Sequence, residues 1–210
     1  GIITVDDIVD IIEEETTEDM EKMAAIVPSD KPYMKTGVFE TFKKRIPWLL
    51  LLMVSATFTG AIISSFEDAL SVCAVLVAYI PMLMDTGGNC GSQSSTLIIR
   101  GIALGEIRFS DLFRVMFKEF RVSLIVGVVL AVANGLRIYL TYQQAGMAIV
   151  IALSLVATVI SAKLLGCILP MFAKKIGLDP ALMASPLITT IVDASSIMIY
   201  FFIATKVFRL

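Results

Sequence analysis

Five long apolar runs constrain the fold of this 210-residue chain more than any other feature. A helix needs about 20 residues to cross the hydrocarbon core of a membrane, and each run is of that order. We expect five spans, at about residues 47–66, 69–99, 121–140, 146–172 and 180–205. With 57% hydrophobic residues, the chain is predicted to be an all-α, multi-pass membrane protein in contact with lipid.

An acidic segment comes before the spans. Residues 1–30 hold ten acids and one base, which leaves nine acids and sixteen bases for residues 31–210. Ile2–Val5 is a short β-like run, and Thr4 with Asp7 three residues later is typical of a capping box at the start of a helix. The carboxylates that follow are either a solvated face or a surface that gathers divalent cations. The chain does not begin with Met, so we expect it to be a piece of a longer one.

A second segment, residues 31–46, follows a proline-rich linker. Val38, Phe39, Phe42 and Ile46 share one helical face, and three basic residues stand near its end. This pattern predicts a juxtamembrane amphipathic helix that lies at the membrane surface.

The basic residues of the short connections predict the orientation. Ten lie on one side of the membrane: Lys43, Lys44, Arg45, Arg100, Arg108, Arg114, Lys118, Arg121, Lys174 and Lys175. Three lie on the other: Arg137, Lys206 and Arg209. With five spans, we expect a cytoplasmic amino terminus and an external carboxy terminus.

The second span is unusually polar. Its stretch Pro81–Thr96 carries an acid, three glycines and many hydroxyl or amide side chains. Such residues survive in hydrocarbon only inside protein or along a water-filled cavity. Gly88, Ser92 and Thr96 are spaced four apart and share a helix face, so they predict one wall of a pathway. Gly87 and Gly91 also form a GxxxG pair, typical of close helix packing, with the same span of a second subunit as one possible partner.

The fifth span carries a matching stripe. Ser185, Thr189 and Asp193 are again spaced four apart, and Asp193 lies close to the predicted membrane midplane. A carboxylate at that depth is costly and usually marks an ion or proton route. The two stripes predict two walls of one pore; hydrogen bonding between helices is the alternative explanation for the Ser and Thr residues.

Three further polar residues are candidates for the pore mouth or for pairing. Asp85 and Asn89 lie beside the glycines, and Lys163 is the basic residue expected at depth in the fourth span. Lys163 either snorkels, pairs with an acid or takes part in transport. Asp85 either lies near the pore mouth or contacts Lys163.

The available ligands favour a hard cation. The chain has no His, and its three cysteines form no CxxC pair. A few carboxylates supported by hydroxyls and carbonyls suit Mg²⁺, which sheds its waters reluctantly. In a twofold dimer, Asp193 would occur twice about the axis. An enzyme is disfavoured, since no nucleophile has a nearby base.

These motifs resemble the MgtE family of magnesium channels. The resemblance rests on Thr86–Ser95 with its Gly-Gly-Asn, on Arg100-Gly101, on Asp179-Pro-Ala and on Thr189–Asp193. It implies a homodimer in a prokaryotic plasma membrane, with a pore at the dimer axis lined by the second and fifth spans. Asp193 would be the principal residue binding hydrated Mg²⁺, with Gly88, Ser92, Thr96, Ser185 and Thr189 lining the site.

The same resemblance assigns the remaining parts. Residues 1–30 would be the remnant of a cytoplasmic CBS-like sensor and its linker, residues 31–46 a plug-like helix, and 47–210 the pore domain. Mg²⁺ would be both the transported and a regulatory ion, and the rest of the cytoplasmic sensor, in the full-length chain, would be a partner of this part. The alternatives are a carrier that exchanges the divalent cation for Na⁺ or H⁺, and a non-transporting regulatory or assembly protein.

Overall fold

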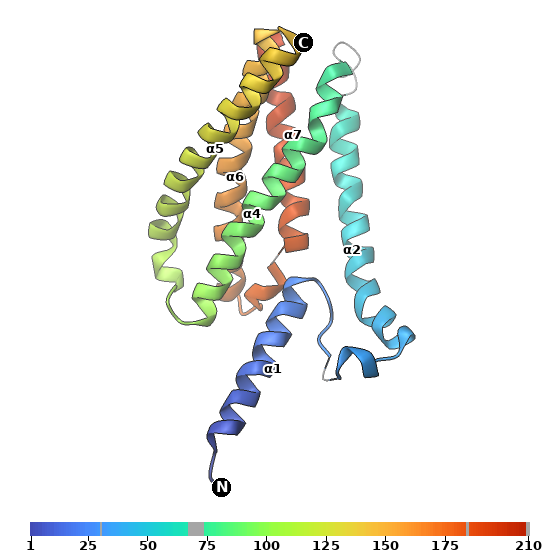
Figure 1. Ribbon diagram of the computed structural model, residues 1–210, viewed down its shortest axis with the longest axis vertical. Helices are drawn as coiled ribbons and strands as arrows, with labels where there is room; N and C mark the ends of the chain where they lie inside the picture. Colours follow the sequence, from blue (N-terminus) through green and yellow to red (C-terminus); the bar gives the residue numbers. More distant parts are fainter. Residues whose placement is uncertain (30, 67–73, 184, 209–210) are drawn as a thin grey trace.

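The fold is all-α, as expected, in the residues that the computed structural model describes: 1–29, 31–66, 74–183 and 185–208. One helix, α1 (Val5–Met23), protrudes from one end of a bundle formed by α2 (Val38–Ser65), α4 (Ile80–Ala103), α5 (Leu112–Tyr142), α6 (Ala145–Lys175) and α7 (Ser185–Phe208) (Figure 1). Short 3-10 turns join them at Tyr33–Lys35, Ala74–Tyr79, Phe109–Asp111 and Pro180–Met183. No strand is present among these residues.

The capping box at the start of α1 is confirmed. The Thr4 backbone N–H donates to an Asp7 carboxylate oxygen at 2.8 Å, and the Asp7 N–H donates back to the Thr4 hydroxyl at 3.4 Å. These bonds satisfy amide groups that a helix amino terminus otherwise leaves open. The β-like run is not a strand, because Val5 already begins the helix and residues 1–4 pair with no other strand in the described chain.

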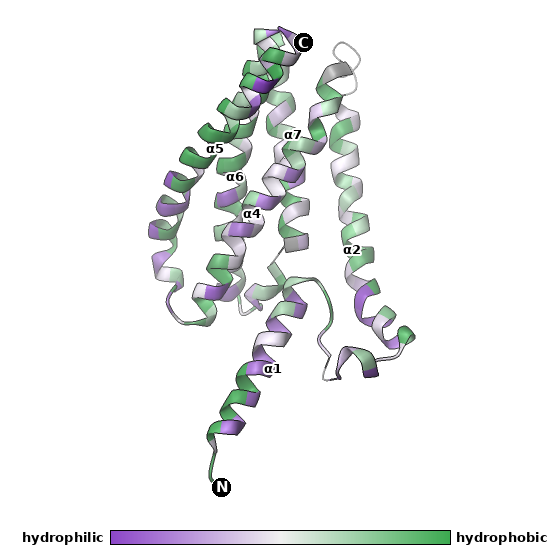
Figure 2. Ribbon diagram, in the orientation of Figure 1, coloured by the Kyte–Doolittle hydropathy of each residue, from purple (hydrophilic) through white to green (hydrophobic). Residues whose placement is uncertain are grey.

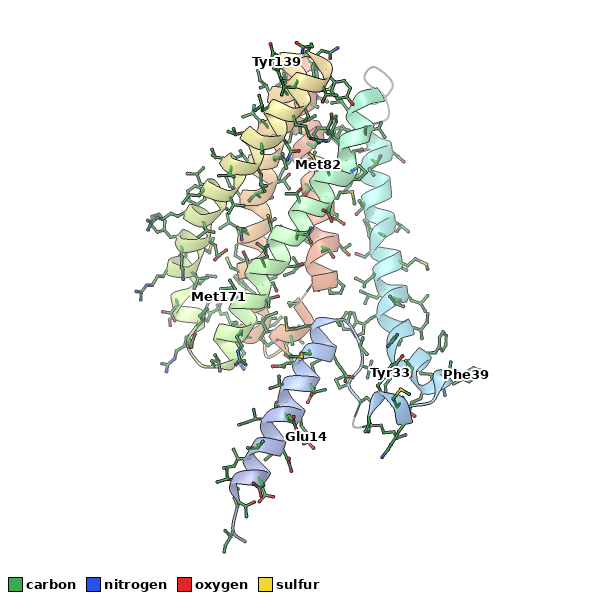
Figure 3. The ribbon with its side chains drawn as sticks, in the orientation of Figure 1. Glu14, Tyr33, Phe39, Met82, Tyr139 and Met171 are labelled. Carbon is green, nitrogen blue, oxygen red and sulfur yellow. The ribbon has the colours of Figure 1, made fainter. Side chains whose placement is uncertain are left out.

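The expected juxtamembrane helix is not separate from the first span. Helix α2 continues from Val38 to Ser65 with Pro47 inside it. Proline removes one backbone hydrogen bond from a helix interior, and here the helix continues through that gap. The aromatic residues at this end, Tyr33 and Phe39, are exposed and lie far from Tyr139 at the other end of the bundle (Figure 3).

Within the described residues, four helices are long and apolar enough to cross a membrane: α2, α6, α5 with its preceding turn, and α7 with its preceding turn. Helix α4 has 24 residues but falls outside this group because of its polar residues, and Figure 2 shows it less uniformly apolar than α6. Its predicted beginning near Ala69 lies outside the described residues, and the helix itself begins at Ile80. The third span, predicted at 121–140, is part of a longer helix, since α5 already begins at Leu112.

The bundle core lies where α4, α6 and α7 meet. Helix α5 packs on the outer side of α6, and α2 packs on α7. Leu83, Ile151, Leu155 and Phe201 are almost fully buried in the largest apolar cluster. The Tyr200 hydroxyl, also buried there, donates to the Leu76 carbonyl at 2.9 Å. This core fixes the position of α4, which crosses the bundle diagonally (Figure 1).

Candidate functional site

Helices α4 and α7 bring three of the predicted site residues together. A Cβ atom built on Gly88 would lie 2.9 Å from Thr189 Cγ2 and 3.9 Å from Asp193 Oδ1. Only a residue without a side chain therefore fits on α4 at this point. Asp193 is partly buried, so its carboxylate stands at the α4–α7 seam with one side open to the outside of the single chain.

The glycine pair of α4 makes this close approach possible. A Cβ on Gly87 would lie within 2.9 Å of Ser196, Thr158 and Val192 side chains, and one on Gly91 would meet Ile188 Cγ2 at 2.9 Å. The Gly91 backbone packs against the small residues Ala162 and Gly166 of α6. The GxxxG pair thus packs helices closely, as the motif predicts. Its partners are α6 and α7 of the same chain, which corrects the suggestion that it meets a second subunit.

The opposite side of α4 carries an exposed polar face. Asp85, Asn89, Gln93 and Thr96 are exposed and Ser92 is partly exposed. At 100° per residue, Asp85, Asn89, Ser92 and Thr96 fall within about 60° of one another. Gln93 is absent from the predicted set, although its position four residues after Asn89 could have indicated it.

The α7 stripe is described in part. The Thr189 hydroxyl donates to the Pro186 carbonyl at 2.9 Å, which leaves its methyl group against Gly88. Ser185 is the first residue of α7, and its side chain lies outside the described residues. Thr189 and Asp193 therefore carry the described part of the stripe.

Lys163 does not pair with Asp85, which lies on the exposed face of α4. Instead its ammonium group lies 3.9 Å from Glu119 of α5 and donates to the Ser94 hydroxyl at 3.3 Å. Lys163 and Glu119 are 5% and 8% exposed, so this is an interior ion pair. Glu119 is missing from the predicted set because the basic residues around it suggested a cytoplasmic connection. The buried small residues that follow it at intervals of four, Ser123, Gly127 and Ala131, could have indicated an inward face.

Comparison with known proteins decides the family. Residues 80–203, which include α4 and nearly all of α7, match the family model MgtE, described as a divalent cation transporter. This chain belongs to the MgtE family. It is 37% identical over 204 residues to the magnesium transporter MgtE of Thermus thermophilus and 39% identical over 206 residues to that of Bacillus subtilis. These alignments cover 97% and 98% of the chain but 45% of each relative. A third, from Enterococcus faecalis, is 31% identical over 209 of the 210 residues of this chain, which correspond to 46% of that protein.

The MgtE match includes every residue proposed for the site, from Asp85 to Asp193. The alignments with the relatives extend further, over α1 and α2. The relatives carry the name of transporters, which agrees with the expectation that the chain is not an enzyme. The membrane character of the family also agrees with the four apolar helices.

An ion pair joins the end of α1 to the turn that precedes α7. Lys22 near the end of α1 lies 2.7 Å from an Asp179 carboxylate oxygen and 2.5 Å from Glu18. Hydrogen bonds to Asp179 and then to Glu18 raise the pKa of Lys22. Burial alone would raise the pKa of Asp179, but hydrogen bonds from Lys22 and from the Ala181 amide outweigh it and leave that pKa below its usual value. Both groups are therefore charged at neutral pH.

A cavity of about 500 Å³ lies beside this ion pair. Its polar lining comes from α1, from the end of α6 and from the α6–α7 connection, and includes Glu15, Asp19, Lys22, Lys174 and Asp179. Burial, together with the nearby Asp179 charge, raises the pKa of Asp19. The acidic helix is thus joined electrostatically to the base of the bundle.

Proposed function

We propose that this chain forms a pathway for Mg²⁺ across the membrane, as a passive channel built from two copies. The observation that carries the proposal is the placement of Asp193 beside Gly88, next to the exposed polar face of α4. A row of polar side chains facing lipid would be strongly disfavoured. A second copy with its own α4 and α7 would cover that face and enclose a polar path.

The chemistry of the face suits a hydrated divalent cation. Each chain offers the Asp193 carboxylate, and the hydroxyl and amide oxygens of Ser92, Thr96 and Asn89 lie on the face of α4. Mg²⁺ binds oxygen ligands and commonly keeps several of its waters. Two Asp193 carboxylates about a twofold axis would balance its charge. The names of the MgtE relatives, magnesium transporters, support the same ion.

The proposal extends to orientation and regulation. The basic residues of the connections support a cytoplasmic amino terminus, with α1 on that side; the membrane would be a prokaryotic plasma membrane. Helix α1 would then be the last part of a cytoplasmic sensor of the CBS type, and α2 would connect it to the pore. Mg²⁺ gathered by the acids of α1 would favour the closed state.

A coupled carrier is the second candidate, because a midplane carboxylate also serves Na⁺ or H⁺ exchange. The two mechanisms differ in measurable ways. A channel passes Mg²⁺ down its electrochemical gradient with a voltage-dependent current, whereas a carrier stops when the coupling ion is removed. The packing roles of Gly87 and Gly91 alone would fit an assembly protein, but they leave Asp193 without a role.

Mg²⁺ flux into reconstituted liposomes tests the proposal. Asp193→Ala should abolish Mg²⁺ uptake while the protein still elutes as a folded dimer. The matched control is Glu106→Ala, since Glu106 is an exposed acid in the turn after α4, away from the site; it should transport like the parent. Unchanged uptake by Asp193→Ala would overturn the assignment. Parallel assays with Ca²⁺, Mn²⁺ and Co²⁺ measure selectivity.

A further inference from the structure

Three polar side chains from three different helices meet in the apolar interior. The Ser94 hydroxyl of α4 donates to Glu119 of α5 at 2.6 Å and accepts a hydrogen bond from Lys163 of α6 at 3.3 Å. The Lys163 ammonium group lies 3.9 Å from the same Glu119 oxygen. Ser94 is fully buried, and the two charged residues are at least nine-tenths buried. We refer to these residues as the Ser94 network.

The Ser94 network lies behind α4 with respect to the exposed polar face. Ser94 follows Asp85 by nine residues, which at 100° per residue places it about 180° around the helix. Its neighbours are the close contacts of α4 with α6: a Cβ built on Gly166 would lie 3.1 Å from Ser94 Cβ. The network therefore faces away from the side on which we place the ion.

The arrangement satisfies two charges that would otherwise be costly. An ionised group inside a membrane protein is normally paired, because an unpaired one loses its hydration without compensation. Here a serine hydroxyl, which can donate and accept at once, bridges an acid and a base. Because the three helices contribute one group each, a shift of α4 relative to α5 or α6 would break at least one hydrogen bond. The network thus discriminates against displaced positions of α4.

We infer that Ser94, Glu119 and Lys163 are positioning residues for transport: they fix α4 in the place and rotation that direct its polar face at the permeating ion. The inference rests on the proposed Mg²⁺ pathway. It assigns the buried charges a structural role in permeation and excludes them as carriers of ions or protons. Removing one charge should be far more harmful than removing both, because a single removal leaves the other charge buried and unpaired.

The first test compares Glu119→Gln, Lys163→Met and the double variant that carries both changes. Each single variant should give little folded protein by size-exclusion chromatography. The double variant should recover folded protein, because no buried charge is left unpaired. It should also recover Mg²⁺ flux in liposomes, but with a half-saturating concentration above that of the parent, because Lys163 no longer holds Ser94. Recovery of folding without any flux would show that the charges themselves take part in transport and would overturn the inference. So would single variants that fold and transport like the parent.

The second test uses Ser94→Ala and Ser94→Thr, with Tyr200→Phe as the matched control. Tyr200→Phe also removes a buried hydrogen-bonding hydroxyl, but at the core cluster away from the site. Flux is measured against Mg²⁺ concentration at equal amounts of folded protein. Since misplacement of a binding group can cost up to about 100-fold, Ser94→Ala should raise the half-saturating concentration by about tenfold. Ser94→Thr, which keeps the hydroxyl, and the control should stay close to the parent.

The outcomes separate this inference from the proposed function. Equal changes in Ser94→Ala and Tyr200→Phe would mean general loss of stability and would overturn the inference, as would no change in Ser94→Ala. If Ser94→Ala gives no folded protein, the inference is tested instead by whether the Glu119–Lys163 double variant recovers folding and Mg²⁺ flux. Normal flux by Asp193→Ala would refute the pathway itself, whatever the Ser94 variants do.

Discussion

The contact between Gly166 of α6 and the Gly91 backbone of α4 allows a sharp stability prediction. A Cβ on Gly166 would collide with the Gly91 carbonyl oxygen, and would lie 3.1 Å from both the Gly91 carbonyl carbon and Ser94 Cβ. Carbon–oxygen contacts shorter than about 3.3 Å are avoided, and a backbone carbonyl cannot rotate away as a side chain can. In Gly166→Ala the two helices must therefore separate by up to about 1 Å, a distance that also moves the pore face of α4.

Overpacking of this kind costs about 1–3 kcal/mol, and the better helix propensity of alanine offsets about 1 kcal/mol. Because backbone atoms are involved, we expect an overpacking cost near the upper end of that range, which leaves a net loss of about 2 kcal/mol. For a chain of this size this corresponds to a melting temperature lower by about 4–8 °C. Mg²⁺ flux per folded protein should fall as well.

Gly60→Ala is the matched control, because Gly60 is also inside a long helix and a Cβ there would meet nothing within 4 Å. This variant should gain about 0.5–1 kcal/mol from propensity alone. The melting temperature of detergent-solubilised protein, followed by size-exclusion chromatography after heating, measures both effects. If Gly166→Ala melts as high as Gly60→Ala, the close α4–α6 contact does not exist as described.

Two other perturbations test separate parts of the structure. Lys22→Met should free α1 from Asp179 and speed hydrogen exchange of the last turn of α1 at neutral pH. In the parent, this stabilisation should be lost as pH falls below 3.8 toward the lowered pKa of Asp179. It should also be lost as pH rises beyond 10.5 through the raised pKa of Lys22. Equal rates of amide hydrogen exchange in the two proteins at pH 7 would contradict the ion pair. Tyr200→Phe should remove the buried hydrogen bond to the Leu76 carbonyl and cost about 0.5–1.5 kcal/mol. An unchanged melting temperature would show that this bond contributes nothing.

Spacing along single helices made much of the site predictable. Thr189 and Asp193 share a face because they are four residues apart, and Gly88 meets them because a residue without a side chain permits close approach. The capping box at Thr4 was predictable for the same reason, since all its atoms lie within one turn. Local patterns such as these need no knowledge of the fold.

What the sequence could not supply depends on contacts between distant segments. Glu119 lies among basic residues in sequence, and only packing with α4 and α6 shows that it is the partner of Lys163. The GxxxG pair predicts a close neighbour but not which helix supplies it. Pro47 suggested a helix boundary, whereas α2 continues through it, because one lost hydrogen bond does not outweigh the rest of a 28-residue helix.

The central claim, that the ion passes along the polar face of α4 beside Asp193, is tested most directly by thiol accessibility. Asn89→Cys and Leu97→Cys, each in a chain without its native cysteines, place a thiol on two exposed positions of the same helix that differ in direction. We predict that a charged methanethiosulfonate reagent blocks Mg²⁺ flux in Asn89→Cys, that Mg²⁺ slows this block, and that Leu97→Cys is unaffected. The account would be contradicted if Mg²⁺ flux through Asn89→Cys were unchanged after modification, or if the reagent blocked Leu97→Cys to the same extent.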